Sequence, residues 1–512
     1  MSHRPSKPGL PAIWNARRGL VCAWLVLTGF AQTLGAIALS TGSAALLAGR
    51  PDVHGFPVLV VLLASALVAL GAFVLQTRGA ERFALSYVHD VRLAYARHVL
   101  LVPFDAKSPA TGLSLTRLVN DLGAVKLWLS KGLLALVTLA ATLITLAGWI
   151  VAASPSYLVP LAMCLGVWGV GTAVAMPGLR KSIRKSRQRR GDIAILLGKV
   201  LPERLPLLLH GKLAPVLGKL SRKSQDVCSL LVDRATWSGT MRAISRVTFP
   251  AAVTAYALSG SIDADTIAQF LLIFAFLATQ LETGAAGLEY LEANRVAREK
   301  LNRVFSTTPL GPLEAGQAKG PDWGKPIEIS GLKLPSGDLL SIAIRPAACT
   351  WLMLEEPRDR HHVALSLCGL AQAQSQEAIR LDDCSFADIG RKALWRNITL
   401  VSPVNGIPVY QKDRPAVVLG SRTKSASEEA DIFGEFPGLV PANTADVSRV
   451  QSDRDQIRLR IARALLRRPR VIVVQDDGLI GQKDLLANLQ EQAAARGTTL
   501  VLIALKHQVE AA

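Results

Sequence analysis

Few residues of this sequence have the types and spacing needed to bind a nucleotide. A phosphate-binding loop of the G-x-x-x-x-G-K-[ST] type surrounds phosphate with glycine N–H groups and a lysine, and its hydroxyl holds Mg²⁺. The dipeptide Gly-Lys occurs four times, and neither Ser nor Thr ever follows it. The lysines of these dipeptides are Lys199, Lys212, Lys219 and Lys325. The sequence therefore contains no intact loop of this kind.

Two further pairs of side chains could bind a metal ion. Asp476 and Asp477 follow a short apolar run and could either bind a cation or occupy a solvated turn. His361 and His362 are adjacent, so on a helix they face different sides and make a poor metal pair. The six cysteines form no C-x-x-C pair, which argues against zinc and disulfides. We therefore expect no metal site and no catalytic residue in this chain.

The elements that would position these side chains fall into an apolar part and a soluble part. The chain has 512 residues, enough for about three domain-sized units, and half of them are hydrophobic. Its mean hydropathy is +0.31. Long uncharged runs fill the first 290 residues, whereas the remainder resembles an ordinary soluble domain in composition. This distribution indicates a membrane protein.

A helix of roughly 20 apolar residues crosses a bilayer, and six stretches meet this requirement. The predicted spans are residues 20–48, 56–76, 132–153, 157–176, 238–258 and 267–287. The fifth span is the weakest, because its apolar core is short and Arg242 and Arg246 lie near one end. The first could instead be a cleaved signal peptide, because a basic leader precedes it, but its apolar run is longer than a typical signal core.

The net charge of +19 indicates which side of the membrane the loops face. A basic balance can mean nucleic acid binding or inside-facing loops. The densest cluster, Arg180 to Arg190, directly follows an apolar span and has few aromatic residues nearby, so we favour loops and expect no nucleic acid partner. A solvated helix face is also compatible. We expect an integral protein of a bacterial inner membrane, with the tail at 1–19 and the C-terminus cytoplasmic.

The predicted spans come in pairs, with short connections outside and long connections inside. The long connections keep helical periodicity, as in residues 80–100 and 207–231, so we expect the helices to continue into the cytoplasm. Residues 311–325 are rich in Gly, Pro and Lys and indicate a linker. After it, short apolar runs alternate with helical patterns, which predicts a parallel α/β domain over 326–512.

The segment from Val91 to Leu133 carries a recognisable pattern, in which a basic helix is followed by Pro and an aromatic, then Thr-Gly and Asn-Asp. Its residues are Pro103, Phe104, Thr111, Gly112, Asn120 and Asp121. It resembles the transmembrane domain of ABC exporters, and LEANRVAREKLNRVFSTTP resembles the helix that leads into their nucleotide-binding domain. The resemblance covers nearly the whole chain. It implies an exporter-like membrane domain at 20–310 and a P-loop-like α/β domain that lacks the P-loop.

The resemblance also assigns a role to the first inside loop. It implies a short coupling helix that presses on a nucleotide-binding domain, with Phe104 as an apolar knob. The residues of this helix would be Leu101, Val102, Pro103, Phe104 and Asp105. The alternative is that Phe104 only ends a buried helix.

The same resemblance implies that the nucleotide site is degenerate. The phosphate loop aligns with Glu355, Arg358, Arg360, His361, His362 and Val363, and the glutamine of the glutamine loop with Pro403. The signature aligns with Gln451, Ser452, Asp453, Arg454 and Asp455. The second acidic pair aligns with Gln475 and Asp476, and the switch histidine with Leu505. Bulky and acidic side chains replace the glycines that would cradle phosphate. Charged residues also replace the signature glycines that bring a helix N-terminus to the γ-phosphate.

Three hypotheses about function follow. In the family, each ATP site combines the phosphate loop of one subunit with the signature of the other, so a homodimer of this chain would have no working site. The first hypothesis is an export subunit paired with an intact second exporter half, which supplies ATP and Mg²⁺. The second is a non-hydrolysing structural or regulatory scaffold in the membrane. The third is an unrelated binding domain in the C-terminal half. The apolar spans do not specify a transported substrate.

Overall fold

The computed structural model describes residues 10–14, 16–47, 56–105, 121–201, 204–258, 264–310, 321–403 and 453–506. Contacts between residues divide the chain into two compact units, one within 1–100 and 109–307 and the other within 101–108 and 308–512. The residues of the predicted coupling helix thus belong to the second unit. Ten residues of the predicted linker, 311–320, lie outside the described part, so the linker and its boundaries stay a prediction.

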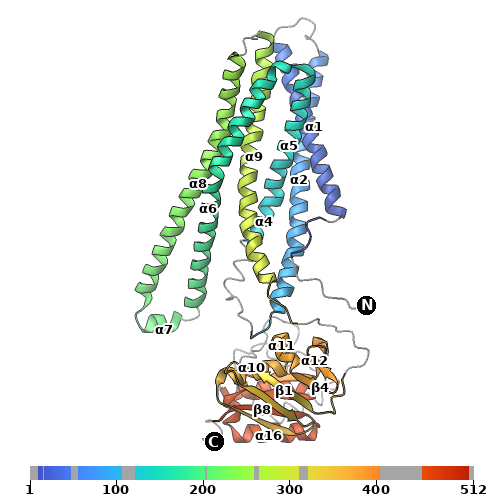
Figure 1. The fold of residues 1–512 in the computed structure, drawn as a ribbon, viewed down its shortest axis with the longest axis vertical. Helices are drawn as coiled ribbons and strands as arrows, with labels where there is room; N and C mark the ends of the chain where they lie inside the picture. The colour runs from blue at the N-terminus through green and yellow to red at the C-terminus, as the bar shows by residue number, and fades with distance from the viewer. Residues whose placement is uncertain are drawn as a thin grey trace. The chain divides into compact units, whose positions relative to one another are not determined.

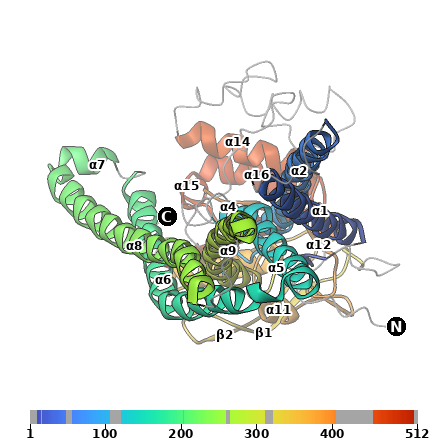
Figure 2. The same cartoon turned by 90° about the horizontal axis from the view of Figure 1, so that it is seen from above.

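The first unit is built from long helices (Figures 1 and 2). Its elements are α1 (Ala16–Leu47), α2 (Phe56–Leu100), α4 (Leu122–Leu127), η3 (Trp128–Gly132), α5 (Leu133–Ala153), η4 (Pro155–Tyr157), α6 (Leu158–Val200), α7 (Arg204–Leu209), α8 (Leu213–Leu258) and α9 (Ala264–Phe305). In both views α6 and α8 run side by side, and the short α7 lies at their tip. Helices α6, α8 and α9 each join an apolar stretch and a charged stretch in one continuous helix.

Five helical segments of the described chain are long and apolar enough to cross a membrane. They are Arg18–Ala44, Val60–Leu100, Leu122–Ala153, Pro155–Val200 and Ile267–Phe305. The chain is therefore an integral membrane protein. The predicted fifth span, at 238–258, lies in α8, which is not among the five. Its apolar stretch is short and Arg242 and Arg246 flank it, so a sixth span stays a prediction.

Aromatic rings fill the core where η4, α8 and α9 meet. The Tyr256 and Phe270 rings stack with their centroids 4.3 Å apart, and the Phe270 and Phe274 centroids are 4.4 Å apart. Tyr157 packs edge-on against Tyr256, with its ring centroid 5.6 Å away. Such pairs contribute about 0.5–1.5 kcal/mol each beyond the burial of their area. This cluster therefore fixes one end of α8 and α9 relative to each other.

Ion pairs join helices of this unit at other points along their length. Asp121 accepts a hydrogen bond from Arg187 at 3.0 Å, and both side chains are largely buried. Glu289 of α9 accepts from Arg234 of α8 at 2.7 Å, and Ser238 donates to its other oxygen at 2.6 Å. Because these carboxylates are shielded from water, losing either arginine would leave an unpaired charge. The charged part of the long helices is thus held together by specific pairs.

The second unit contains two four-stranded sheets. Its elements are β1 (Ile327–Lys333), β2 (Leu339–Ile344), β3 (Cys349–Leu354), α10 (Pro357–Leu367), α11 (Ala373–Glu377), β4 (Ile379–Leu381), β5 (Cys384–Ser385), α12 (Arg391–Asn397), β6 (Ile398–Val401), α14 (Asp453–Leu466), β7 (Val471–Val474), α15 (Asp477–Ile480), α16 (Lys483–Ala495) and β8 (Thr499–Leu505). One sheet is antiparallel in the order β2-β1-β4-β5, and the other is parallel in the order β3-β8-β7-β6.

The parallel sheet carries the polar residues of the candidate site at the ends of its strands. Every residue of β7 and β8 is buried, as expected for central strands covered on both faces. Two separate apolar clusters pack against the sheet, one with α10 and the other with α14 and α16. The predicted α/β domain is thus confirmed, and its parallel pattern holds for this sheet, whereas the antiparallel sheet was not predicted.

Gly132 provides a test of the helix packing in the first unit. A Cβ atom on Gly132 would lie 2.5 Å from the Trp128 ring and 2.8 Å from the Tyr290 Cβ atom, so α9 approaches too closely for any side chain. We expect Gly132→Ala to lower stability by about 1–3 kcal/mol through overpacking. The melting temperature of the purified protein in one detergent measures this.

Gly123→Ala is the matched control, because nothing lies within 4 Å of an added Cβ atom there. Alanine favours the helical state over glycine by roughly 0.5–1 kcal/mol, so this variant should melt at the wild-type temperature or slightly above it. Equal melting temperatures for the two variants would contradict the close packing at Gly132.

Candidate functional site

The connection between β3 and α10 is only two residues long. Strand β3 ends at Leu354, and α10 begins at Pro357, which suits the first position of a helix. The Arg360 N–H donates to the Glu356 carbonyl at 3.2 Å as part of the helix. None of residues 355–362 has a positive φ. The residues predicted at phosphate-loop positions, from Arg358 to His362, therefore lie in a helix rather than in an open loop.

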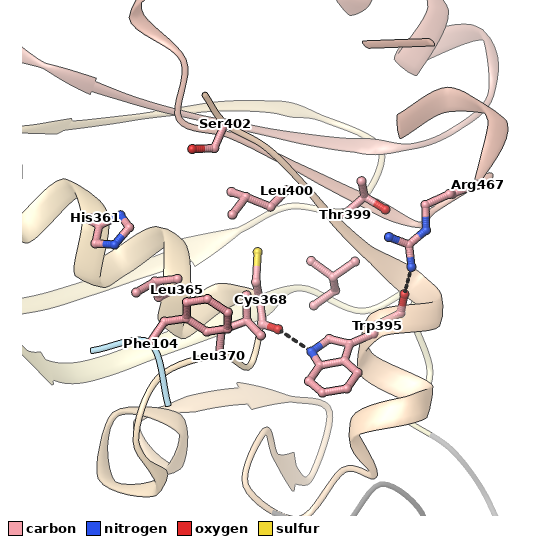
Figure 3. A pocket seen from close by; sticks show the side chains of 11 residues that line it. Phe104, His361, Leu365, Cys368, Leu370, Trp395, Thr399, Leu400, Ser402 and Arg467 are labelled. Carbon is pink, nitrogen blue, oxygen red and sulfur yellow. Dashed lines mark hydrogen bonds between the residues drawn. The ribbon is translucent and has the colours of Figure 1, made fainter. Parts of the chain in front are cut away.

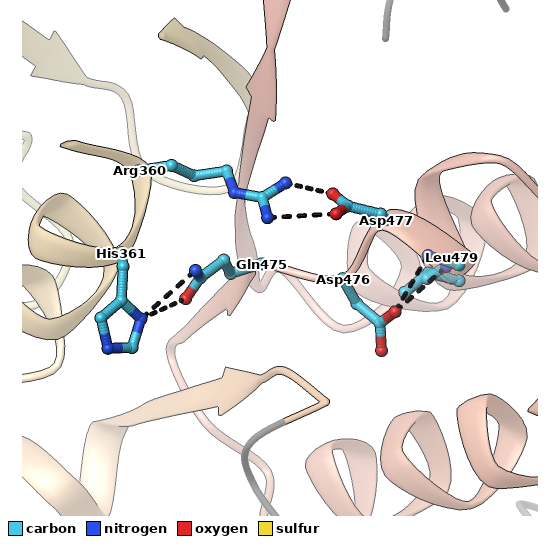
Figure 4. Close-up of polar contacts among 7 residues, drawn as sticks. Arg360, His361, Gln475, Asp476, Asp477 and Leu479 are labelled. Atoms are coloured by element: carbon cyan, nitrogen blue, oxygen red, sulfur yellow. Dashed lines mark hydrogen bonds and ion pairs between the residues drawn. The ribbon is translucent and has the colours of Figure 1, made fainter. Parts of the chain in front are cut away.

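Side chains of this helix pair with the residues that follow β7 (Figure 4). The Arg360 guanidinium donates two hydrogen bonds to the Asp477 carboxylate, one of them at 3.1 Å. The His361 Nδ1 atom lies 3.3 Å from the Gln475 side-chain amide. The residues aligned with the phosphate loop thus contact those aligned with, or next to, the second acidic pair. A bidentate arginine–carboxylate pair is among the stronger polar contacts.

The Asp476 side chain caps a helix and forms an ion pair. It is 2% exposed, and its Oδ1 atom accepts hydrogen bonds from the Gly478 and Leu479 N–H groups at 3.1 and 3.4 Å, which caps the N-terminus of α15. Its other oxygen forms an ion pair with Arg460 of α14. Both carboxylates that could have bound a cation, Asp476 and Asp477, are thus each paired with an arginine. Within the described ranges no group of three or more His, Cys, Asp or Glu side chains could hold a metal ion.

Other predicted site residues do not join the contacts between α10 and the residues after β7. Glu355 is exposed and accepts a hydrogen bond from Lys506 at 2.6 Å, which lowers the pKa of that carboxyl. Leu505 is buried at the end of β8, opposite Leu354 in the sheet. Arg358 and Pro403 are exposed. Gln451 and Ser452, the start of the predicted signature, lie outside the described residues.

Arg460 was not predicted as a site residue, although it completes the pairing. It lies on α14 and reaches Asp476 across the edge of the sheet. Two features of the sequence could have indicated this pair: a buried carboxylate needs a cation, and several arginines precede β7. The sequence does not say which of those arginines faces the sheet.

The predicted coupling residues contact the region after α10. The Phe104 N–H donates to the Leu370 carbonyl at 3.0 Å, and the Asp105 Oδ2 atom accepts from the Gln372 N–H at 3.1 Å. Residues 101–105 form turns, not the helix that was expected, because Pro103 has no N–H and disfavours helical backbone at Val102. The Phe104 ring is 62% exposed and borders a cavity (Figure 3).

His362 links these contacts to α10. Its Nε2 atom lies 3.2 Å from the Ser375 hydroxyl, and its Nδ1 atom lies 3.8 Å from the Asp105 carboxylate. Burial lowers the pKa of His362, and the nearby charges of Asp105 and Asp359 oppose this in part. The neutral imidazole is therefore favoured in the folded protein.

Comparison with known proteins finds a match only at the level of structure. The sequence matches no protein family and no curated protein. The fold is similar to a solved structure described as a bacterial Atm1-family ABC exporter with ATP bound, with a TM-score of 0.76 and 14% sequence identity. The similarity covers 97% of this chain and 91% of that chain. The similarity supports an ABC exporter-like fold for both halves of the chain.

The Asp476–Arg460 pair predicts a loss of stability that is separate from any catalytic role. Asp476→Asn keeps an oxygen that can cap α15 but removes the charge opposite the largely buried Arg460, so we expect a loss of about 3 kcal/mol. Asp484→Asn is the control, because its pair with Arg454 is exposed and should contribute at most about 1 kcal/mol. Melting temperatures in one detergent compare them, and equal losses would contradict the assignment.

His362 predicts a pH dependence of stability. Because its pKa is lowered on folding, the unfolded chain binds the proton more readily, and stability falls as the pH drops from about 7 through the folded pKa. We expect His362→Asn to lose less melting temperature than the wild type between pH 7.5 and 5. His210→Asn, at an exposed position, should follow the wild type. A His362→Asn curve parallel to the wild-type curve would refute this.

Proposed function

We propose that this chain, which folds as an ABC exporter, is an export subunit whose own nucleotide site neither binds nor hydrolyses ATP. The observation that carries this proposal is the pairing of the site's residues with one another. Arg360 holds Asp477, and Arg460 holds Asp476, so the cations and carboxylates that would meet Mg-ATP are already neutralised.

The backbone supports the same proposal. A phosphate loop binds by pointing several free N–H groups at one centre. Here the connection after β3 is two residues long, and the Arg360 N–H is used inside α10. Glu355 and Glu356 occupy the connection and would repel phosphate. A triphosphate would have to unwind the first turn of the helix and break the Arg360–Asp477 pair.

An intact second exporter half is the partner that fits this chain. In ABC exporters each site takes its phosphate loop from one subunit and its signature from the other. A heterodimer would leave one site without a loop and the other without the signature glycines, because the signature positions here are Gln451 to Asp455. ATP and Mg²⁺ would bind through the partner's loop, and hydrolysis at that site would be slow. The chain itself would act as a pseudo-ATPase.

The remaining parts have roles in this proposal. The sixth span would lie in α8, and the chain would sit in a bacterial inner membrane with both termini cytoplasmic, as the basic connections indicate. Residues 101–105 would transmit movement, because Phe104 and Asp105 are hydrogen-bonded to the C-terminal unit. The membrane domain would comprise 20–310, and the degenerate domain 326–512.

A non-hydrolysing membrane scaffold is the second candidate. It is favoured by the same pairs, because a site that is complete without a ligand needs no nucleotide to be stable. The two functions differ in their need for an intact partner.

Reconstitution in lipid vesicles tests the proposed function. We expect this chain alone to show no ATPase activity above empty vesicles, and coexpression with an intact exporter half from the same genome to give a stable complex with activity. Alanine in place of the partner's phosphate-loop lysine should abolish that activity, whereas His361→Ala in this chain should leave it within about twofold. Activity of the chain alone would contradict the export proposal and the scaffold alike. A complex whose activity survives the partner substitution would contradict the assignment of the site to the partner.

A further inference from the structure

The C-terminal unit contains a cavity that borders the coupling residues and the candidate nucleotide site (Figure 3). Its volume is about 440 Å³, within the range of small-molecule sites. It lies between α10, β6 and the residue that follows α14, with Phe104 at its rim. Most of its lining is apolar, namely Phe104, Leu365, Cys368, Leu370, Trp395, Ile398 and Leu400. The polar side chains in its wall are Arg467, Thr399, Ser402 and His361, the last of which contacts Gln475.

Arg467 is the feature that gives this cavity a chemical preference. Its Nη2 atom donates to the Trp395 carbonyl at 2.9 Å, and no Asp or Glu of the described residues forms an ion pair with it. Partial burial lowers the pKa of Arg467. A guanidinium carries five N–H donors, so one backbone acceptor leaves most of its capacity unused. A shielded cation with this surplus favours an anion.

Three arginines of the C-terminal unit differ from Arg467 in this respect, whereas the buried Arg391 also has only a backbone acceptor among the described residues. Arg360, Arg454 and Arg460 each pair with an aspartate. Arg467 instead borders the apolar cavity, and Figure 3 shows its guanidinium beside Trp395. The unit therefore neutralises those arginines with its own carboxylates and leaves this one facing a space.

The apolar wall of the cavity favours a ligand whose remaining part, beside its anionic group, is apolar. The Trp395 indole N–H donates to the Cys368 carbonyl at 3.1 Å, which fixes the ring and leaves only its apolar surface for a ligand. Phe104 offers a second ring at the rim of the same cavity. Aromatic rings pack well against other flat apolar groups. Burial of Cys368 raises the pKa of its thiol to about 12, so that group stays neutral and apolar.

We propose that this cavity binds a small monocarboxylate with a flat apolar body. The carboxylate accepts hydrogen bonds from the Arg467 guanidinium, and the body packs against Trp395 and the apolar side chains of α10. The ligand then touches Phe104, so its binding stabilises the contact between residues 101–105 and the region after α10. This site needs no nucleotide and is independent of the proposed partner.

Calorimetric titration of the full-length chain in lipid nanodiscs tests the proposal. The probe is 2-naphthoate, and 2-naphthamide is the matched uncharged compound. Empty nanodiscs correct for partitioning into lipid. We expect saturable binding of the carboxylate, and about tenfold weaker binding or none for the amide, because only the anion uses the guanidinium. Equal affinities, or no saturable binding of the carboxylate, would overturn the proposal.

Variants locate the site. Arg467→Gln should weaken the binding of 2-naphthoate by about tenfold and leave that of 2-naphthamide unchanged, whereas Arg467→Lys should keep most of the affinity. Arg470→Gln, at an exposed arginine three residues away, should bind as the wild type does. Melting temperatures show that each variant is folded. An Arg467→Gln protein that is folded and binds 2-naphthoate as tightly as the wild type would refute the site, and the comparison of the two probes decides the question even if that variant does not fold.

Discussion

The two-residue connection between β3 and α10 is the constraint on which the chemistry of this chain depends. In the helix that begins at Pro357, the Arg360 N–H already donates to the Glu356 carbonyl and is not free for phosphate. The helix also directs Arg360 and His361 toward the residues after β7, where they pair with Asp477 and Gln475. These two side chains, aligned with the phosphate loop, are therefore in contact with the protein's own polar groups.

The membrane unit shows a related use of charge. Its long helices continue past their apolar stretches, and largely buried carboxylates such as Asp121 and Glu289 bind arginines of neighbouring helices. Such pairs specify which faces meet, and removing one partner costs more than the pair itself contributes. The candidate site follows the same rule, since the buried Asp476 carboxylate is paired with Arg460. Arg467 instead donates to a backbone carbonyl, and its cavity is where we expect an external anion.

Hydropathy and segment order were enough to predict much of the fold, because a bilayer demands long apolar helices and a buried parallel sheet demands short apolar strands. Five candidate spans and the α/β pattern followed from these demands. Span five was harder, since Arg242 and Arg246 interrupt the hydropathy of α8. The pairing of the site could not be predicted, because Arg360 and Asp477 are far apart in sequence and meet only through the sheet. The turns at 101–105 were not predicted, because the prediction followed the family pattern and gave the effect of Pro103 on the backbone too little weight.

Equilibrium dialysis of radiolabelled Mg-ATP against the purified full-length chain tests the central claim most directly. The claim is that a site occupied by its own ion pairs, after a connection of two residues, does not admit a triphosphate. We expect no saturable binding up to about millimolar nucleotide, a limit near −4 kcal/mol of binding free energy. Saturable binding at micromolar concentration by the chain alone would contradict the claim.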